Sequence, residues 1–532
     1  MRARRQRSHM NQRMMWACAA VAVLAPGCLT GQQATERGAA TITEEDVAAR
    51  IGVMAHDSMQ GRATPSRGLE LTAEWIASEL GAMGLRGGAP DGDFVQRYPL
   101  RSVAVDAAGS GFRADAAGVV GSTALGYGPD LLPLVPAPTA GQVTAPLVVV
   151  SGSTGPRRAL SGDAVRGKHA ILVAPGSARG VDQSLFSLVI AIAGAGAASV
   201  LVTNGSDDER WGALTAAALE PEIDKTWAAS AGATAPPLRP LLQVRAASVQ
   251  RLVSGTGIDV AALQARAGGS MRVDEVLGRS FTLTQRLDTR SIAAPNVVGI
   301  LDGSDPVLKD EYVVYSAHMD HVGMGRPDES GDSIFNGADD DASGTATVME
   351  VAEAMASLTT APRRSMIFLL VSGEERGLWG SEYYADNPSV PLDRIVAGLN
   401  ADMVGRNWPD TIVAIGKEHS DLGTTLERVN ARHHELGMTA IDDLWPEERF
   451  YFRSDHYNFA RKGVPILFFF NGTHEDYHGL DDEPDRIDAG KAARIAQLLF
   501  HLGLEIGNAD SRPRWNPESY QRIVTDPTGG PR

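Results

Sequence analysis

Cysteine is nearly absent from this chain of 532 residues, which holds only Cys18 and Cys28. Because both lie near the N-terminus, the rest of the chain folds without a disulfide bond and cannot bind a metal through thiolates. Positive charge is also in deficit, with 49 lysines and arginines against 65 acidic residues and a formal net charge of −16. This balance excludes nucleic-acid binding through bulk positive charge, and we expect no nucleic-acid partner.

Long apolar runs are scarce, and the run nearest the N-terminus, Met14–Leu24, is too short to cross a bilayer as a helix of the mature protein. Five arginines and no acidic residue precede it, which is the pattern of an export signal. Leu24-Ala25-Pro26-Gly27-Cys28 resembles a bacterial lipoprotein cleavage site. We therefore expect residues 1–28 to be a signal peptide of a secreted chain, in the periplasm, the extracellular space or the bacterial cell envelope. The mature chain is then either a lipoprotein anchored at Cys28 or released by plain cleavage.

Two hydrolase patterns are missing from the expected structure. Ser454-Asp455-His456 holds the residue types of a serine hydrolase, but no Gly-x-Ser-x-Gly turn lies near it. We also expect no helix with the sequence His-Glu-x-x-His, which excludes the thermolysin-like zinc arrangement.

Composition and periodicity divide the chain into segments. Residues 29–41 have the composition of a flexible linker, and residues 42–105 hold two helical patterns followed by a strand. Residues 106–290 are rich in Ala, Gly, Val and Pro, with short β-type runs. From 291 to 507 strands alternate with helices, which predicts an α/β fold with a mixed, largely parallel sheet flanked by helices. We expect residues 508–532 to be a disordered tail.

Side chains that can bind a metal follow four of the predicted strands. Tyr312–Ala317 leads to His318, Met366–Val371 to Glu374 and Glu375, Ile395–Asn400 to Asp402, and Pro465–Phe470 to Tyr477 and His478. Ligands of open α/β sheets gather outside the carboxyl ends of the strands, so these side chains should meet in one crevice. The loop acids Asp339, Asp340 and Asp341 should join them. Imidazoles and carboxylates together suit a divalent metal such as zinc.

A pair of zinc ions makes further demands on the ligands. Ions about 3.5–4 Å apart repel each other, so they need a carboxylate between them and more anionic ligands around them. Another carboxylate must stay unbound to take a proton from water. Adjacent glutamates such as Glu374 and Glu375 can divide these two tasks.

In chain order these residues form motifs that resemble those of the M28 peptidases, the co-catalytic zinc aminopeptidases. The motifs are His318-Met319-Asp320, Asn336–Gly344, Ser372–Glu375, Asn400–Gly405 and Tyr477-His478. The resemblance implies two Zn²⁺ ions per chain, one held by His318 and Asp402 and the other by Glu375 and His478, with Asp340 as the bridge. It also implies that Glu374 is the general base, that Asp320 orients His318 and that Tyr477 donates to the oxyanion. For His321, His456 and His474 it implies no ligand role, and we expect them to be structural or to contact substrate.

The segment 106–290 interrupts the implied peptidase domain, which comprises residues 42–105 and 291–507. Its stretches Val165–Val173 and Ala193–Val202 resemble those of a protease-associated (PA) domain, a β-rich module often inserted in exopeptidases. We therefore expect an inserted, β-rich, PA-like domain at 106–290. His169 lies inside an apolar run of this segment, and we expect it to be structural.

The implied activity is removal of N-terminal residues from peptide substrates by a metallo-exopeptidase, with a modest preference for apolar residues. Three alternatives stay open. A carboxypeptidase or dipeptidase of the same scaffold would use arginines such as Arg376, Arg406 or Arg453 to bind the substrate's carboxylate. A glutaminyl cyclase would typically use one zinc ion, and a receptor-like module would have no catalytic activity.

Overall fold

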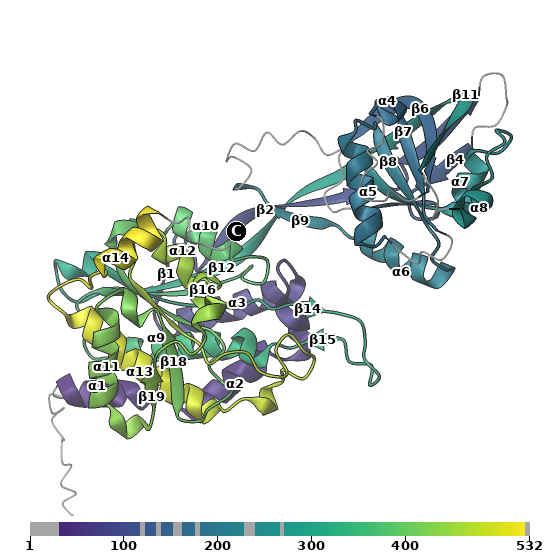
Figure 1. Cartoon of the computed structure of the whole chain (residues 1–532). Helices are drawn as coiled ribbons and strands as arrows, with labels where there is room; N and C mark the ends of the chain where they lie inside the picture. The colour runs from purple at the N-terminus through teal and green to yellow at the C-terminus, as the bar shows by residue number, and fades with distance from the viewer. Residues whose placement is uncertain are drawn as a thin grey trace, which may run out of the picture.

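The computed structural model describes residues 31–116, 123–134, 140–152, 162–175, 181–227, 240–266 and 271–526. The expected signal peptide, including Cys28, lies outside the described residues. The described chain forms two lobes joined by a twisted ribbon of strands (Figure 1). Within these ranges no helix has the length and apolar character needed to span a membrane.

The larger lobe is built on a ten-stranded sheet in the order β19-β18-β20-β17-β13-β16-β12-β2-β9, with β1 paired to β12. Its central strands are parallel and almost wholly buried: β20 (Ile466–Phe469), β17 (Ile395–Ala401), β13 (Tyr312–His318) and β16 (Ser365–Val371). Such continuous burial is typical of parallel strands covered on both faces.

The outer strands make the sheet mixed, as the alternation of strands and helices predicts. Antiparallel neighbours flank the parallel centre: β18 (Thr411–Ile415) beside β20, and β12 (Leu287–Leu301) and β2 (Val95–Val105) beyond β16. The short strands β19 (Thr439–Ile441), β9 (Glu222–Lys225) and β1 (Arg86–Gly87) complete it. The predicted α/β fold with a mixed sheet is therefore confirmed, and the sheet is parallel at its centre with antiparallel pairs on either side.

Helices cover both faces of this sheet. One face packs against α2 (Glu44–Met54), α3 (Arg67–Ala82), α9 (Gly344–Ala356), α11 (Leu422–Arg432) and α13 (Ala489–Asn508). The other packs against α10 (Trp379–Asp386), α12 (His456–Ala460) and η11 (Gln521–Thr525). Successive side chains of β13 point to opposite faces of the sheet. Val313 and Tyr315 therefore pack against the first group of helices, and Val314 packs against the second.

Helix α13 approaches β13 closely enough to require a glycine. A Cβ atom at Gly503 would lie 1.5 Å from the Tyr315 hydroxyl, which donates a hydrogen bond to the Leu499 carbonyl at 3.0 Å. The absent side chain lets the helix lie directly on the strand that ends at His318. The position of that histidine therefore depends on the packing of the last long helix.

Two segments that we expect to be flexible are ordered. Helix α1 (Gly31–Ala39) occupies most of the expected linker and packs on α9 and α13. In the expected tail, residues 509–526 are described, α14 (Pro517–Tyr520) forms, and Trp515 and Ile523 pack in the core beneath the sheet. Both predictions were wrong because polar composition hides a few apolar side chains that anchor a segment.

The smaller lobe lies within the segment 106–290 and has its own eight-stranded sheet, in the order β4-β3-β11-β6-β7-β8-β10-β5. Its parallel strands are β6 (Gly141–Ser151), β7 (His169–Val173), β8 (Ser199–Asn204) and β10 (Leu241–Arg245). The antiparallel ones are β3 (Gly111–Ala116), β4 (Thr123–Gly126), β5 (Leu131–Pro133) and β11 (Arg272–Gln285).

Helices accompany this second sheet, so the lobe is α/β and not built of strands alone. They are α4 (Gly162–Val165), α5 (Gln183–Gly194), α6 (Asp208–Leu219), α7 (Ala246–Leu252) and α8 (Val260–Ala265). The resemblance to a PA domain stays a prediction.

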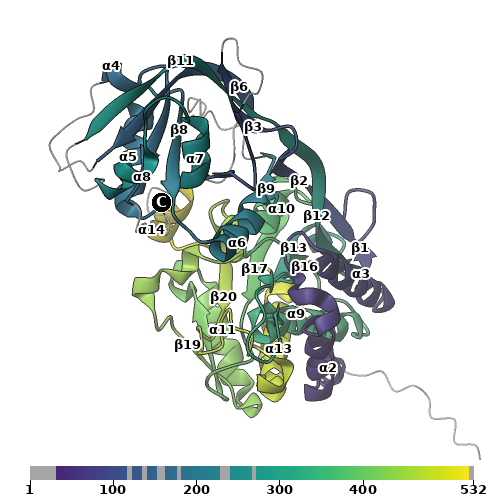
Figure 2. The same ribbon diagram turned by 90° about the vertical axis from the view of Figure 1, so that its right-hand side faces the viewer.

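A strand ribbon connects the lobes, as Figure 2 shows from the side. Strand β12 pairs with β2 along the whole of β2, from Val95 to Val105, and β9 pairs with the far edge of β2. The β9 strand comes from inside the segment 106–290 yet belongs to the sheet of the larger lobe. The boundary between the lobes is therefore crossed by three strands.

His169 of β7 is completely buried and has a partner at each ring nitrogen. Its Nδ1 lies 2.7 Å from Ser199 Oγ and its Nε2 lies 3.1 Å from the Phe281 carbonyl oxygen. Burial lowers the pKa of His169 from 6.5 to about 4. A neutral, hydrogen-bonded imidazole of this kind fits the structural role expected for it.

The low pKa of His169 predicts that acid weakens the fold. As the pH falls below about 6.5, the unfolded chain binds a proton that the folded chain refuses until about pH 4. Stabilisation present above pH 6.5 should therefore be lost towards pH 4, at a cost of about 3 kcal/mol. Denaturant titrations of the wild type and His169→Gln across this range measure it. The variant should lose less stability on acidification, and equal losses would contradict the prediction.

Candidate metal centre

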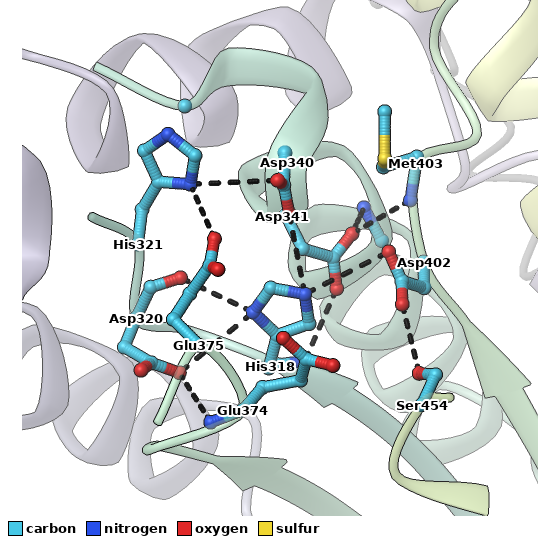
Figure 3. A network of polar contacts seen from close by, with 12 residues as sticks. His318, Asp320, His321, Asp340, Asp341, Glu374, Glu375, Asp402, Met403 and Ser454 are labelled. Carbon is cyan, nitrogen blue, oxygen red and sulfur yellow. Dashed lines mark hydrogen bonds and ion pairs between the residues drawn. The ribbon is translucent and has the colours of Figure 1, made fainter. Parts of the chain in front are cut away.

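Side chains at or after the ends of four strands meet at one edge of the larger sheet, and Figure 3 shows those of β13, β16 and β17. His318 is the last residue of β13, Glu374 and Glu375 follow β16, and Asp402 directly follows β17. His478 comes from the loop after β20, and Asp340 from the loop ahead of α9. Because these strands are parallel and adjacent, their carboxyl ends lie together, where α/β sheets bind ligands.

These side chains form two groups that share the carboxylate of Asp340. His318 Nε2 lies 3.3 Å from Asp340 Oδ1 and 3.6 Å from Asp402 Oδ1. On the other side, His478 Nε2 lies 3.1 Å from both Asp340 Oδ2 and Glu375 Oε1. Within each group the ligand atoms lie within 4.8 Å of one another. The donor atoms therefore fit two divalent ions with Asp340 between them, and the structure brings the five predicted ligands together.

The second group also contains His321, for which we expect no ligand role. His321 Nδ1 lies 3.0 Å from Glu375 Oε1 and 3.6 Å from Asp340 Oδ2, and the ring is completely buried. The signal in the sequence was its place directly after Asp320, at the same strand exit as His318.

The three consecutive aspartates have different surroundings. Only Asp340 belongs to both groups of ligand atoms. Asp341 instead accepts backbone N–H bonds from His318, Gly344 and Met403 at 2.9–3.1 Å. It thereby ties the end of β13 to the start of α9 and to the turn after β17. The choice of Asp340 as the shared carboxylate agrees with this geometry.

Two buried residues that we did not single out in the sequence hold the aspartate loop. Asp482 accepts the backbone N–H groups of Asp339 and Asp340 at 3.0–3.1 Å. Arg62, of which 1% is exposed, donates to four backbone carbonyls at 2.7–2.9 Å, those of Met54, Met319, Asn336 and Gly337. No motif marks Arg62, because its partners lie mostly more than 250 positions away in the chain.

Asp320 lies between His318 and the turn that carries Glu374. Its Oδ1 is 3.7 Å from His318 Nδ1, which lies closer, at 3.2 Å, to the backbone oxygen of Asp320. The carboxylate accepts hydrogen bonds from Thr64 Oγ1 at 2.8 Å and from the Glu374 N–H at 3.3 Å. Asp320 is therefore placed to fix both the histidine and the glutamate turn.

Ser454, Asp455 and His456 do not form a catalytic triad. Ser454 Oγ donates to Asp402 Oδ2 at 2.8 Å. His456 stacks on Phe468 at a centroid distance of 4.3 Å, and burial lowers its pKa to about 3. Ser454 thus fixes the orientation of Asp402, a role that its sequence context did not reveal.

The sequence His474-Glu475-Asp476-Tyr477-His478 does match His-Glu-x-x-His, although we expect no helix of that kind. It forms turns instead of a helix. His474 Nε2 lies 3.3 Å from Asp339 Oδ2, whereas His478 faces Asp340. The two imidazoles therefore do not share a site, and the thermolysin-like arrangement is not formed.

A cavity opens beside the shared carboxylate. Its lining combines polar groups with aromatic walls: His318, Asp340, Glu374, Asp402, Met403, Phe450, Arg453, Ser454, Phe468, Phe470, Thr473 and Tyr477. Of the three arginines that could bind a substrate carboxylate, Arg453 alone is in this lining. Arg376 donates to the Thr64 carbonyl at 3.2 Å, and Arg406 pairs with Asp476 at 2.7 Å.

Proton binding at the centre is strongly perturbed. The hydrogen bonds that the His478 imidazole donates to Asp340 and Glu375 raise the pKa of His478 to about 10. Burial acts to raise the pKa of Glu375, but the imidazoles of His321 and His478 outweigh it and hold that pKa below its usual range. Burial, and after it the nearby carboxylates of Asp455 and Asp402, raise the pKa of Glu374 well above its usual range. Such a centre favours positive charge and can exchange protons for metal cations.

Residues 296–503 match the model described as peptidase family M28. This stretch contains the predicted ligands from His318 to His478.

The chain carries an M28 peptidase domain.

Several curated proteins are similar to part of this chain. Leupeptin-inactivating enzyme 1 of Streptomyces exfoliatus is 29% identical over 253 residues, which cover 46% of this chain and 52% of the relative. A probable leucine aminopeptidase of Arthroderma otae is 25% identical over 41% of this chain and 58% of its own length. A probable zinc metalloprotease of Pyrenophora tritici-repentis is 43% identical over 220 residues, which cover 34% of this chain and 45% of the relative. The chain thus spans about half the length of the curated relatives it matches.

Two solved structures are similar over most of the chain. An aminopeptidase from Aneurinibacillus sp. strain AM-1 has a TM-score of 0.47 and 19% identity, covering 94% of this chain and 100% of its own. BSAP, a zinc aminopeptidase from Bacillus subtilis, has a TM-score of 0.47 and 18% identity. The match covers 87% of this chain and 95% of BSAP.

The different surroundings of Asp340 and Asp341 predict opposite phenotypes for the same substitution. Asp340→Asn should abolish retention of metal and should destabilise the metal-free protein less than Asp341→Asn does, because the Asp340 side chain faces imidazoles whereas the Asp341 side chain accepts backbone N–H bonds. Asp341→Asn should cost about 2–3 kcal/mol, because its amide group would oppose a buried backbone N–H. Elemental analysis and denaturant unfolding of the two variants measure both quantities. Equal destabilisation by the two substitutions would contradict the assignment.

Proposed function

We propose that the chain is a zinc-dependent aminopeptidase that hydrolyses the N-terminal peptide bond of peptides, with two Zn²⁺ ions per chain. The observation that carries the proposal is the carboxylate of Asp340, shared between two groups of ligand atoms at the mouth of a cavity that Glu374 also lines. His318 and Asp402 would hold one ion, and Glu375 and His478 the other.

Glu374 has the position of a general base. It lines the cavity beside the shared carboxylate but belongs to neither group of ligand atoms. Bound zinc would lower the pKa of a water molecule towards 7 and polarise the scissile carbonyl. Glu374 would take the proton of the attacking water and return it to the leaving amine. Its backbone N–H bond to Asp320 fixes the turn that carries it.

Tyr477 has the position of a proton donor to the oxygen of the scissile carbonyl. Its ring lines the cavity and stacks on His478 at a centroid distance of 4.0 Å. Burial, and after it the charge of Asp340, raise the pKa of Tyr477. The phenol therefore keeps its proton at neutral pH and can donate a hydrogen bond to developing negative charge.

The cavity lining supports a preference for apolar side chains at the N-terminal residue. Phe450, Phe468 and Phe470 form the apolar part of the wall. The name of one relative, a probable leucine aminopeptidase, also favours an apolar residue at the N-terminus of the substrate. We propose the same class of peptide substrates for this chain.

One observation supports the carboxypeptidase alternative. Arg453 lines the cavity, and its guanidinium lies over the Phe450 ring, 4.8 Å from the centroid. A guanidinium in this position could bind a substrate carboxylate. Against it stands the carboxylate of Glu374 in the same lining, which belongs to neither ligand group and favours the ammonium group of a free N-terminus.

Export of the protein is part of the proposal. The pattern of residues 1–28 supports secretion, with Cys28 either as a lipid anchor or as part of a cleaved leader. We also propose that the smaller lobe is a PA-like domain. It would then accompany the M28 domain as an accessory module.

The choice of substrate end can be tested directly. We expect the zinc-loaded protein to release p-nitroaniline from amino-acyl p-nitroanilides, and faster from leucyl than from glutamyl substrates. N-blocked dipeptides with a free carboxylate should not be hydrolysed. Hydrolysis of the blocked dipeptides alone would exclude the aminopeptidase and favour the carboxypeptidase. Cyclisation of an N-terminal glutamine would favour the cyclase.

The role of Glu374 predicts a loss of turnover without a loss of metal. Glu374→Gln should lower kcat by at least about 10²–10⁴-fold, the usual contribution of a general base. Its zinc content should equal that of the wild type, because Glu374 belongs to neither ligand group. Glu475→Gln is a matched control, since Glu475 is exposed in the turn next to His478 and belongs to neither ligand group. Near-normal kcat in Glu374→Gln would refute the assigned base.

A further inference from the structure

We infer that His321 is a metal ligand, so that one ion of the pair is held by four side chains, His321, Asp340, Glu375 and His478. The inference rests on the proposed zinc binding and adds a ligand to the five that the M28 motifs imply. It also makes the two halves of the centre chemically unequal.

The spacing of the donor atoms fits one ion among four ligands. In a tetrahedral zinc site with bonds of about 2.0–2.2 Å, ligand atoms lie about 3.3–3.6 Å from one another. His321 Nδ1 lies 3.0 Å from Glu375 Oε1 and 3.6 Å from Asp340 Oδ2. His478 Nε2 lies 3.1 Å from each of the same two oxygens. All four atoms are within 4.8 Å of one another, so each can reach a common centre.

The hydrogen bonding of His321 leaves room for such a centre. Among the described residues, neither ring nitrogen of His321 has a hydrogen-bond partner, and Glu375 Oε1 has none either, although Nδ1 and Oε1 are 3.0 Å apart. The pair is therefore close without being aligned for an N–H···O bond. Buried polar atoms are nearly always paired, and a cation between the two atoms would supply the missing partner to both.

The surrounding backbone gives the His321 ring its position. Gly337 has a φ of +58°, and a Cβ atom there would lie 2.5 Å from His321 Cγ. Arg62 binds the backbone on both sides of the ring, since it donates to the Gly337 carbonyl at 2.9 Å and accepts the His321 N–H at 3.3 Å. A glycine that yields space and a buried guanidinium thus direct the ring towards Glu375 (Figure 3).

The consequence is an asymmetric pair of metal sites. Four protein ligands complete a tetrahedral shell, as in structural zinc sites, whereas the three ligands His318, Asp340 and Asp402 leave one position open, as in catalytic sites. The four-ligand site should therefore bind its ion more tightly. The three-ligand site should lose its ion first and keep the free position for substrate.

Stepwise removal of zinc from the full-length holoprotein tests the inference. Under titration with a chelator, the wild type should pass through a form with one zinc per chain. X-ray absorption of that form should show two imidazoles on the ion, from His321 and His478. His321→Ala should weaken the more tightly held ion by more than about 100-fold, since loss of a partner that only orients a ligand already costs about 10–100-fold. One imidazole on the retained ion, or unchanged affinity in His321→Ala, would overturn the inference.

Two further variants separate ligation from packing. His321→Cys should recover most of the lost affinity, because a thiolate binds zinc whereas it cannot replace a ring that only fills space. His474→Gln is the matched control, since His474 is also a buried imidazole beside an aspartate of the same loop but belongs to neither ligand group. It should keep the wild-type affinity, and equal weakening by His474→Gln and His321→Ala would overturn the inference.

Failure of the inference can be told apart from failure of the proposed function. If the wild type binds no zinc and hydrolyses no peptide, both the inference and the proposed function are wrong. If the wild type holds two zinc ions and has aminopeptidase activity, but His321→Ala keeps the more tightly bound ion, only the inference is wrong. Circular dichroism of the metal-free variants establishes that they are folded, and His321→Cys supplies the measurement if His321→Ala is not.

Discussion

The centre depends on one carboxylate whose two oxygens face opposite ways. Asp340 Oδ1 is directed to His318 and Oδ2 to His478, so the same side chain belongs to both groups of ligands. A bridge of this kind works only if its backbone is fixed. Asp482 binds the N–H groups of the loop from one side, and Arg62 binds the carbonyls just before it. Both residues are buried, which makes these contacts part of the core.

Burial of so many acids would be costly without compensation. Burial removes water from a carboxylate, and hydrogen bonds or opposite charges in the protein must replace it. Asp341 is held by three backbone N–H groups, and the acids of the two groups face imidazoles. The M28 domain thus separates acids that the peptide backbone satisfies from acids that only a cation can satisfy. The same distinction explains why the neighbouring residues Asp340 and Asp341 have different tasks.

Much of this could be predicted from the sequence, because strand ends and ligand types are local signals. The run Tyr312–Ala317 followed by His318, and the glutamate pair after β16, identify both the sheet and its ligand edge. Arg62 and Ser454 could not be found in this way. Their partners lie far along the chain or in another element, so their roles appear only once the segments are packed together. The order of residues 31–39 and 509–526 escaped prediction for the same reason, since each depends on a few contacts with a distant core.

His321 shows where a resemblance to a family can mislead. The shared motifs assign five ligands, and a histidine outside them is naturally given a structural role. Packing favours the ligand role that we infer, because Gly337 and Arg62 leave the ring facing Glu375 with no hydrogen-bond partner among the described residues. The chemistry of the site then follows from unequal numbers of ligands around one bridge. A centre that holds one ion with four groups and the other with three can keep its scaffold intact while a substrate binds at the open position.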